Sequence, residues 1–143
     1  MLLVDVNVLV YAYREDAPEH GSYRRWLRAC IESEQPYGIA SLVLSGFLRV
    51  VTHPGIFDPP SPLQSALEFA EKVWNQPNCV VVAPGEHHWS IFTGLCRSSD
   101  ARGNLVPDAY LAAMAIESGC ELVTTDTDFA RFPGLRRRHP LRT

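Results

Sequence analysis

The segment NLVPDAYLAAMAIESGCELVTTDTDF, residues 104–129, decides the fold. Apolar residues recur at helical spacing from Leu105 to Ser118, and a glycine stops this predicted helix. The helix leads into an apolar strand, Glu121–Thr124, and Asp126 and Asp128 follow that strand directly. A helix that feeds a buried strand with acids at its end is typical of a parallel α/β sheet.

The first residues of the chain repeat this arrangement. Leu2–Val4 is a continuous apolar run, Asp5 comes next, and a short helix that contains Asn7 is expected after it. The other predicted elements are strands at Tyr37–Ala40, Cys79–Ala83 and near His139–Leu141, helices at His20–Glu34, Ser41–Val51 and His87–Arg97, and a helix that Ser61 opens as N-cap with Pro62 after it. Strands that alternate with helices predict a parallel sheet with helices on both faces.

Composition narrows the class of protein. The 143 residues suit one domain, residues 1–143, with a formal net charge of -3 that gives no general attraction to nucleic acid. The four cysteines form no C-x-x-C pair and are expected to be reduced, and no run of 18 apolar residues or leader sequence is evident. We therefore expect a cytoplasmic protein without a membrane segment.

Four aspartates are the candidate catalytic residues: Asp5, Asp108, Asp126 and Asp128. In open parallel sheets, ligands bind outside the carboxyl ends of the strands, so these acids are expected to share one crevice. Two carboxylates 4 Å apart repel by about 4 kcal/mol at an effective dielectric constant near 20. A cation should therefore lie between them, and an all-oxygen site suits Mg²⁺ or Mn²⁺.

Each acid also has a purely structural interpretation. Asp5 could cap the helix after it, and Asp108 could be stabilised by the dipole of its helix, an effect of about 0.3–1 kcal/mol. One of Asp126 and Asp128 is expected to cap the turn that leads to Phe129. Capping explains each acid alone, but it does not explain why four acids should converge at one end of one sheet.

Other chemistries find little support in the sequence. The histidines are interpreted as surface or packing residues, and no glycine-rich phosphate loop or G-x-S-x-G string occurs. A haloacid-dehalogenase-type phosphatase needs an acid where Asn7 stands, and a receiver domain needs a late lysine, whereas Lys72 is the single lysine. The basic tail Arg136–Arg138, with Arg131 and Arg142, could contact phosphate or be a solvated terminus.

Four strings in the chain resemble a known family. VDVNVLVYAY (4–13), FLRVVTHPGIF (47–57), GNLVPDAYLAAMAIESG (103–119) and LVTTDTDFARFPGL (122–135) are similar to PIN-domain ribonucleases, most closely the mycobacterial-type VapC toxins of type II toxin–antitoxin modules. The resemblance implies a three-layer α/β/α sandwich around a parallel sheet of four to five strands, usually as a homodimer. It also implies Mg²⁺- or Mn²⁺-dependent cleavage of structured RNA, such as tRNA or ribosomal RNA, and silencing by a VapB-type antitoxin.

The resemblance also assigns roles to individual residues. Asp5, Asp108 and Asp126 become metal ligands, and Asn7, Thr125 and Asp128 become supporting residues. One departure is that the family usually has a glutamate three residues before the arginine that is Arg49 here, where this chain has Gly46. The missing carboxylate leaves open whether the site holds one cation or two, and Asp128 is the acid that could replace its charge.

The sequence therefore predicts an endoribonuclease in which a cation orients the scissile phosphate and activates a water molecule. Asp126 or Asp128 is expected to help orient that water, and Asp5 and Asp108 are not expected to have the raised pKa of a general base. The alternative is a catalytically weak PIN-like module that binds RNA or a protein partner, and Gly46 is the residue that favours it.

Overall fold

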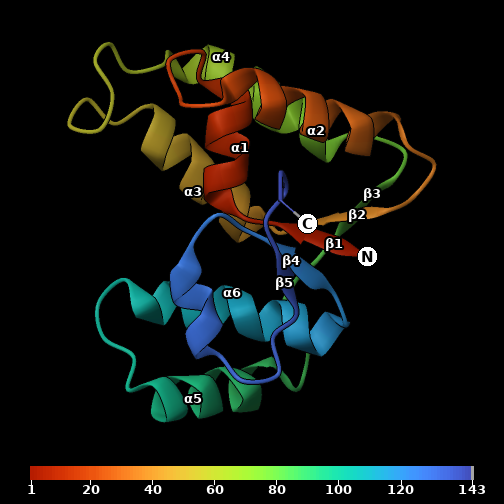
Figure 1. Ribbon diagram of the computed structural model, residues 1–143, viewed down its shortest axis with the longest axis vertical. Helices are drawn as coiled ribbons and strands as arrows, with labels where there is room; N and C mark the ends of the chain where they lie inside the picture. Colours follow the sequence, from red (N-terminus) through yellow and green to blue (C-terminus); the bar gives the residue numbers. More distant parts are fainter. Residues whose placement is uncertain (143) are drawn as a thin grey trace.

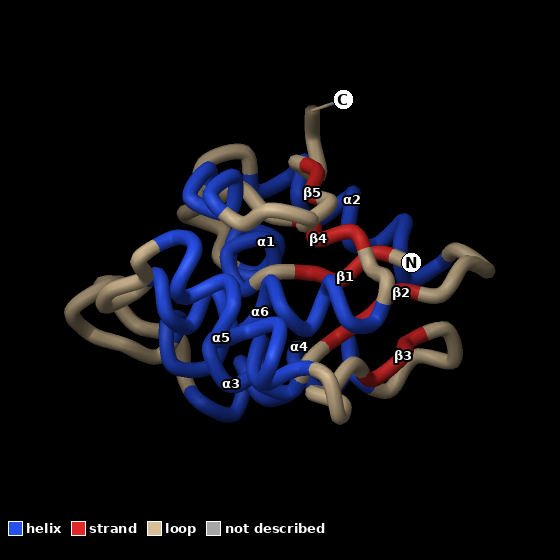
Figure 2. The backbone as a smooth tube through the Cα atoms, turned by 90° about the horizontal axis from the view of Figure 1, so that it is seen from below, coloured by secondary structure: helices blue, strands red, loops and turns tan. Residues whose placement is uncertain are grey.

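The structure, a computed structural model, describes residues 1–142 and contains one parallel sheet. Its five strands lie in the order β3-β2-β1-β4-β5, and every neighbouring pair is parallel. Figure 2 shows them side by side in this order. The strands are β1 (Leu2–Val4), β2 (Tyr37–Ile39), β3 (Cys79–Val81), β4 (Glu121–Val123) and β5 (Arg137–Arg138). The fifth strand thus lies two residues before the predicted position.

Helices cover both faces of the sheet (Figure 1). On one face lie α1 (Val6–Tyr13), α2 (His20–Glu32), α3 (Ser41–Val51) and α4 (Leu63–Trp74), and on the other lie α5 (His88–Ser99) and α6 (Leu105–Ser118). A 3₁₀ helix, η1 (Thr127–Arg131), follows β4. The predicted three-layer α/β/α sandwich is confirmed. None of the helices within residues 1–142 is both long and apolar enough to cross a membrane.

Burial explains why these segments form their elements. Leu3 and Val4 of β1 are completely buried, as expected for a central strand covered by helices on both faces. Helix α6 is rich in small residues, and its buried alanines let it lie close to the sheet. Gly119 ends this helix with a left-handed φ of 71°, which a residue with a side chain adopts at a cost.

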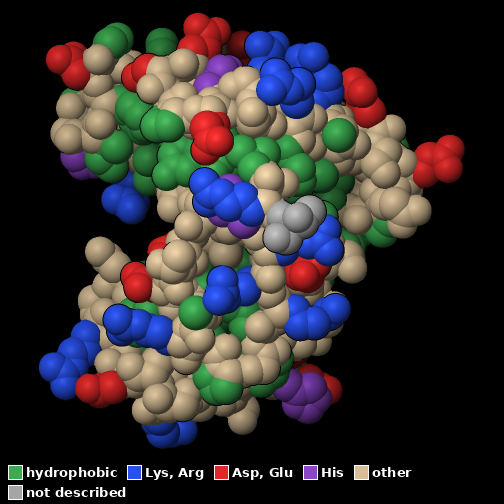
Figure 3. All heavy atoms as spheres, in the orientation of Figure 1, with side chains coloured by type: hydrophobic (Ala, Val, Ile, Leu, Met, Phe, Trp, Pro, Cys, Tyr) green, Lys and Arg blue, Asp and Glu red, His purple; other side chains and the backbone are tan. Residues whose placement is uncertain are grey.

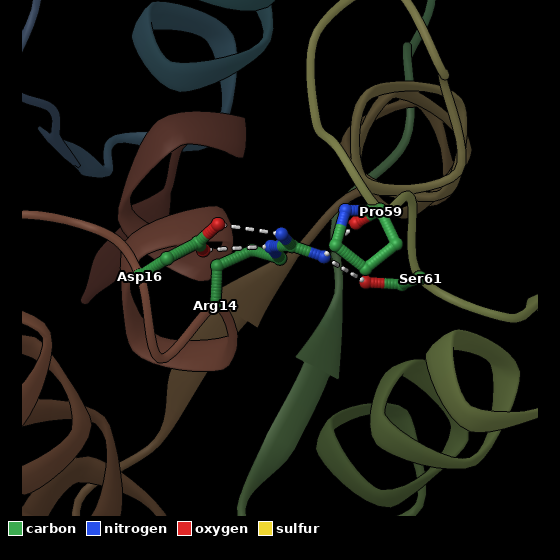
Figure 4. A network of polar contacts seen from close by, with 4 residues as sticks. All are labelled: Arg14, Asp16, Pro59 and Ser61. Atoms are coloured by element: carbon green, nitrogen blue, oxygen red, sulfur yellow. Dashed lines mark hydrogen bonds and ion pairs between the residues drawn. The ribbon is translucent and has the colours of Figure 1, made fainter.

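The start of α4 differs from the prediction. Ser61 does not cap the helix, whose N-cap residue is Pro62. Instead, its hydroxyl accepts a hydrogen bond from Arg14 Nη1 at 3.0 Å, and the same nitrogen donates to the carbonyl of Pro59 at 3.1 Å. Arg14 also donates two hydrogen bonds to Asp16, at 2.9 and 2.6 Å (Figure 4). We call these four residues the Arg14 clasp, which joins the end of α1 to the segment before α4.

The order of the strands fixes where a site can form. The chain moves outward from β1 through β2 to β3, returns to β4 on the other side of β1, and continues to β5. The direction of winding therefore reverses between β1 and β4, and crevices at such switch points bind ligands in open α/β sheets. Asp5 follows β1 and Asp126 follows β4, so both acids lie at this switch point.

Candidate active site

Asp5 is held at the junction of β1 and α1. Its backbone N–H donates to the carbonyl of Val123 at 3.0 Å, and Val4 pairs with Val123 in the β1–β4 register. Its side chain, only 7% exposed, is the N-cap of α1, because the N–H of Val6 donates to Asp5 Oδ1 at 2.7 Å. The carboxylate is therefore fixed by local structure before any ligand arrives.

Thr124 joins Asp5 to Asp126. Its hydroxyl donates to Asp5 Oδ2 at 2.7 Å and accepts a hydrogen bond from the backbone N–H of Asp126 at 3.0 Å. The family resemblance assigns a supporting role to Thr125, and the contribution of Thr124 was missed. The register of the sheet is the signal that finds it, because pairing Val4 with Val123 sets Thr124, the residue directly after β4, beside Asp5.

Asp126 has a capping role as well. Its Oδ1 accepts a hydrogen bond from the backbone N–H of Asp128 at 2.8 Å, which makes it the N-cap of η1. The prediction that one of these two acids caps the turn is confirmed. Asp126 is half-buried, whereas Asp128 is exposed at the rim. Asp5 and Asp126 therefore each cap a helix and also belong to the candidate site.

Asp108 completes the group from the other helical layer. It lies half-buried in the first turn of α6. Its pKa rises from 3.8 to about 6, first because burial disfavours the charged form, and then because the charges of Asp126, Asp5 and Asp128 repel it. The charges of the other three aspartates act on Asp108, so all four sequence-predicted acids lie close enough to interact.

The pKa values overturn one expectation. Asp5 and Asp108 were not expected to have raised pKa values, yet both are raised. For Asp5 the leading cause is burial, which outweighs the lowering of its pKa by hydrogen bonds from Thr124 and Val6. The sequence places the acids but does not show how deeply each is buried, and burial decides these pKa values.

The four acids suit an oxygen-liganded cation by their chemistry. Within residues 1–142, no three His, Cys, Asp or Glu side chains lie close enough together to form a ready-made metal cage. Mg²⁺ does not require such a cage, because it usually keeps several water ligands and binds one or two carboxylates together with substrate phosphates. The pKa of Asp108, which the charges of the other three aspartates help to raise, fits this mode of binding.

Gly46 faces the residue that follows Asp5. A Cβ atom built on Gly46 would lie 3.0 Å from Val6 Cγ2, which is a tight contact. Helix α3 therefore presents the position of the family's missing glutamate toward the start of α1, and Val6 fills part of the space. Asn7 and Thr125 are half-buried, and their supporting roles stay predictions.

The acids lie on the open side of the molecule. In Figure 1, helices α1 and α6 and the 3₁₀ helix η1 begin around the left side of the sheet. Figure 3, in the same orientation, shows a hollow there between the two helical layers. A polymer could therefore reach the carboxyl ends of β1 and β4 from solvent.

Two of the histidines and part of the basic tail make packing contacts. His88 Nε2 contacts the carbonyl of Tyr110 at 2.9 Å, and His20 Nδ1 contacts that of Tyr11 at 2.8 Å. In the tail, Arg138 pairs with Glu121 at 2.9 Å, and Arg136 donates to the carbonyl of Gly119 at 2.8 Å. These contacts hold β5 in place, so Arg136 and Arg138 have structural roles. The sequence alone did not decide what the basic tail does.

A parallel sheet with acids at its switch point is the arrangement of a PIN domain. Residues 2–135 match the PIN domain family, and the chain belongs to it. Among curated proteins, it is 44% identical to ribonuclease VapC43 of Mycobacterium tuberculosis, over 99% of this chain and 96% of that protein. It is 41% identical to ribonuclease VapC25 of the same organism, over 98% and 99% of the two chains.

Solved structures show the same fold at low sequence identity. VapBC2 from Rickettsia felis, bound to a DNA fragment from its promoter, aligns with a TM-score of 0.72 and 19% identity over 96% of this chain and 97% of that one. VapBC-1 from nontypeable Haemophilus influenzae aligns with a TM-score of 0.71 and 11% identity over 99% and 98%. These similarities support the fold.

Proposed function

We propose that this protein is a divalent-cation-dependent endoribonuclease that acts as the toxin of a type II toxin–antitoxin module in the cytoplasm. Membership of the PIN domain family and the near full-length similarity to VapC ribonucleases support this assignment. The observation that carries it is the group of acids at the β1–β4 switch point, where the charges of three aspartates raise the pKa of Asp108. Such repulsion costs stability and is retained where a cation is to be bound.

Asp5, Asp108 and Asp126 are the residues that would hold Mg²⁺ or Mn²⁺. When bound, the cation would supply positive charge to the scissile phosphate and lower the pKa of a water molecule. Thr124 keeps the Asp5 carboxylate in one orientation, and the N–H of Asp128 does the same for Asp126. Of the two acids after β4, one accepts a hydrogen bond from the attacking water and orients it toward the phosphate.

We infer structured RNA, such as tRNA or ribosomal RNA, as the substrate, and water rather than the RNA's own 2′-hydroxyl as the nucleophile. A 2′-hydroxyl attack requires a histidine or similar base beside the site. His20 and His88 instead contact backbone carbonyls with their ring nitrogens. Asp108 has a raised pKa, but it is one of the acids that would hold the cation, and a carboxylate bound to a cation is not free to take the proton. Cleavage by water expels the 3′-oxygen and leaves a 5′-phosphate and a 3′-hydroxyl.

The partner that we propose is a VapB-type antitoxin, with the toxin itself as a homodimer. The solved relatives are VapBC complexes, one of them bound to promoter DNA. A group of uncompensated carboxylates attracts a fork-shaped guanidinium, which can bridge two of them. We expect an arginine of the antitoxin to lie near Asp5 and Asp126 in the silenced complex.

The second candidate is a catalytically weak RNA- or partner-binding module. Gly46 favours it, because it removes one carboxylate from the position facing Val6. A nuclease assay of the isolated protein with added Mn²⁺ separates the two functions. The enzyme cleaves RNA under these conditions, and the binding module does not.

The chemical ends of the products test the mechanism. Cleavage should stop with EDTA, return with Mn²⁺, and leave 5′-phosphate and 3′-hydroxyl ends that sequencing of adapter-ligated fragments detects. It should also survive a 2′-deoxy substitution at the cleaved nucleotide, provided that the substituted RNA still binds. A 2′,3′-cyclic phosphate, or cleavage that ignores chelation, would contradict the mechanism even if the protein degraded RNA.

A further inference from the structure

A second hollow opens beside the acids. It has a volume of about 260 Å³, slightly less than a typical pocket for a drug-sized ligand. Its lining residues come from α1, α2 and the connection between them, from the segment after β4 and from the segment after β5: Tyr11, Pro18, Glu19, Tyr23, Thr125, His139 and Arg142. We call it the tyrosine hollow. Thr125 lies directly before Asp126 in the sequence, so the segment after β4 contributes a residue to this hollow and the next residue to the acidic site.

The interior of the hollow is aromatic. The ring centroids of Tyr11 and Tyr23 lie 5.1 Å apart at an interplanar angle of 56°, and the ring of His139 lies 6.2 Å from that of Tyr23. Tyr23 is 4% exposed and firmly packed, whereas Tyr11 and His139 are half-buried. Proteins stack the unpaired bases of single-stranded RNA on aromatic faces, and in this hollow Tyr11 and His139 are the partly accessible rings, with Tyr23 packed behind them.

Both ring nitrogens of His139 lie close to groups of the protein. Its Nδ1 accepts a hydrogen bond from the backbone N–H of Leu141 at 3.1 Å, and its Nε2 lies 3.5 Å from the hydroxyl of Tyr23. Burial lowers the pKa of His139, the nearby charge of Arg142 lowers it further, and the charge of Glu19 opposes both. These contacts fix the orientation of the ring, so its face is available for stacking.

The rim carries two opposite charges that do not pair with each other. Glu19 and Arg142 are both exposed, and neither belongs to an ion pair among the residues that the structure describes. The backbone of Glu19 adopts the left-handed region, with φ of 57° and ψ of 22°, which is unfavourable for a glutamate. A strained residue with a free carboxylate beside an aromatic hollow is a candidate for ligand recognition.

We propose that the tyrosine hollow binds one unstacked guanine base of the RNA substrate, next to the phosphate that the acids cleave. Guanine presents two N–H donors side by side, which match the two oxygens of the Glu19 carboxylate. It also presents the acceptors O6 and N7, which match the guanidinium of Arg142. Adenine, cytosine and uracil each lack the paired donors. This inference rests on the proposed function, since it assigns a base preference to that same nuclease.

Binding of short RNAs without cleavage tests the proposal. The probes are fluorescently labelled pentaribonucleotides UUXUU, with guanine, adenine, cytosine, uracil or hypoxanthine at X, titrated in EDTA against the full chain carrying Asp108→Asn. Fluorescence anisotropy should show the guanine probe binding at least about fivefold tighter than the other four, the lower end of the discrimination expected from one bidentate hydrogen-bonded pair. Hypoxanthine tests the carboxylate directly, because it differs from guanine by one amino group.

Matched variants locate the preference. Glu19→Gln keeps the size and the exposed position of the side chain, and it should reduce the guanine preference to less than twofold. Glu15→Gln, at another exposed glutamate of the α1–α2 connection, should leave the preference unchanged. Tyr11→Leu should weaken all five probes together, and circular dichroism checks that this variant remains folded.

The outcomes separate this inference from the proposed function. Equal binding of all probes, no binding of the guanine probe, or a preference untouched by Glu19→Gln would overturn the base site. Any of these results is compatible with Mn²⁺-dependent cleavage by the native chain, in which case the nuclease stands without the hollow. If the guanine preference is present but the native chain never cleaves RNA, the hollow is confirmed and the enzymatic function is wrong.

Discussion

An aspartate near each end of helix α1 has a shifted pKa, and the two shifts are in opposite directions. Just past its carboxyl end, Asp16 accepts two hydrogen bonds from Arg14, and these lower the pKa of Asp16. Before its first residue, Asp5 is buried among other acids, and its pKa is raised. Two differences explain the opposite shifts: Asp5 is buried, which is the main cause of its raised pKa, whereas Asp16 is exposed. Asp16 also accepts its hydrogen bonds from the positively charged guanidinium of Arg14, and Asp5 has no such cation among residues 1–142.

This contrast separates structural charge from functional charge. In the Arg14 clasp, the charge of Asp16 balances that of Arg14. Arg14 also lies 4.2 Å from the ring centroid of Phe57, so the clasp stabilises the fold without a ligand. The acidic site is incomplete, because its carboxylates repel one another. The start of α1, where carboxylates repel one another at a cost in stability, is therefore the end at which we expect a ligand to bind.

The largest expected effect comes from removing an acid. Asp5→Asn or Asp108→Asn should reduce RNA cleavage by at least about 100-fold, equivalent to about 3 kcal/mol of transition-state stabilisation. Thermal unfolding without metal should occur at the same or a higher temperature, because a repelling charge is gone. Asp100→Asn is the control, since that exposed aspartate pairs with Arg102 and should keep full activity. A loss of activity that coincides with unfolding would favour a purely capping role.

The clasp should show the opposite pattern. Arg14→Met leaves the buried hydroxyl of Ser61 and the carbonyl of Pro59 without their donor. We expect a loss of about 1–3 kcal/mol in the free energy of unfolding, measured by urea denaturation. Cleavage at a temperature where the variant is folded should stay within about twofold of the native rate. If activity fell while stability held, the two ends of α1 would not be separable in this way.

A smaller effect is expected from restoring the missing acid. Gly46→Glu combined with Val6→Ala, which removes the 3.0 Å contact, should tighten Mn²⁺ binding about tenfold by titration calorimetry. Gly46→Gln with the same Val6→Ala is the control, because it adds equal bulk without charge. If Gly46→Glu alone created activity in an otherwise inert protein, the binding-module alternative would hold for the native chain.

The smallest effect concerns pH. A carboxyl group whose pKa is raised on folding binds more protons in the folded state, so stability decreases as pH rises between its unfolded and folded pKa values. For Asp108 this window runs from 3.8 to about 6. Melting temperatures of the metal-free protein should therefore fall across that window, and Asp108→Asn should flatten the profile. Asp16, with a lowered pKa, acts in the other direction and should lose its contribution as pH falls below 3.8.

Much of the fold follows from local sequence. The helices Ser41–Val51 and Leu105–Ser118 have the predicted bounds, because their apolar stripes and end signals are local. The predicted position of β5 was wrong by two residues, because a strand of two exposed residues is defined by its pairing with β4 and not by its own apolar pattern. Ser61 was misassigned because a cap is a local prediction, whereas Arg14 reaches it from 47 residues away.

The candidate site divides in the same manner. The positions of Asp5, Asp108, Asp126 and Asp128 follow from where strands end and helices begin. Thr124 and Thr125 are adjacent and chemically identical, so only the sheet register tells which hydroxyl meets Asp5. The raised pKa values depend on burial in three dimensions. Thus the sequence predicts which acids gather, and the structure adds how they are oriented and how strongly they repel.

The hydrogen bond between Asp5 and Thr124 has a consequence for the synthesis of the protein on the ribosome. It joins residues 119 positions apart, and β1 gains its pairing with β4 only when the last fifth of the chain is available. At about 5–20 residues per second, a ribosome needs on the order of ten seconds to pass from one partner to the other. Throughout that interval the nascent chain carries Asp5 without the strand that completes the crevice. The acidic crevice therefore stays incomplete on the ribosome until β4 and Thr124 have been synthesised.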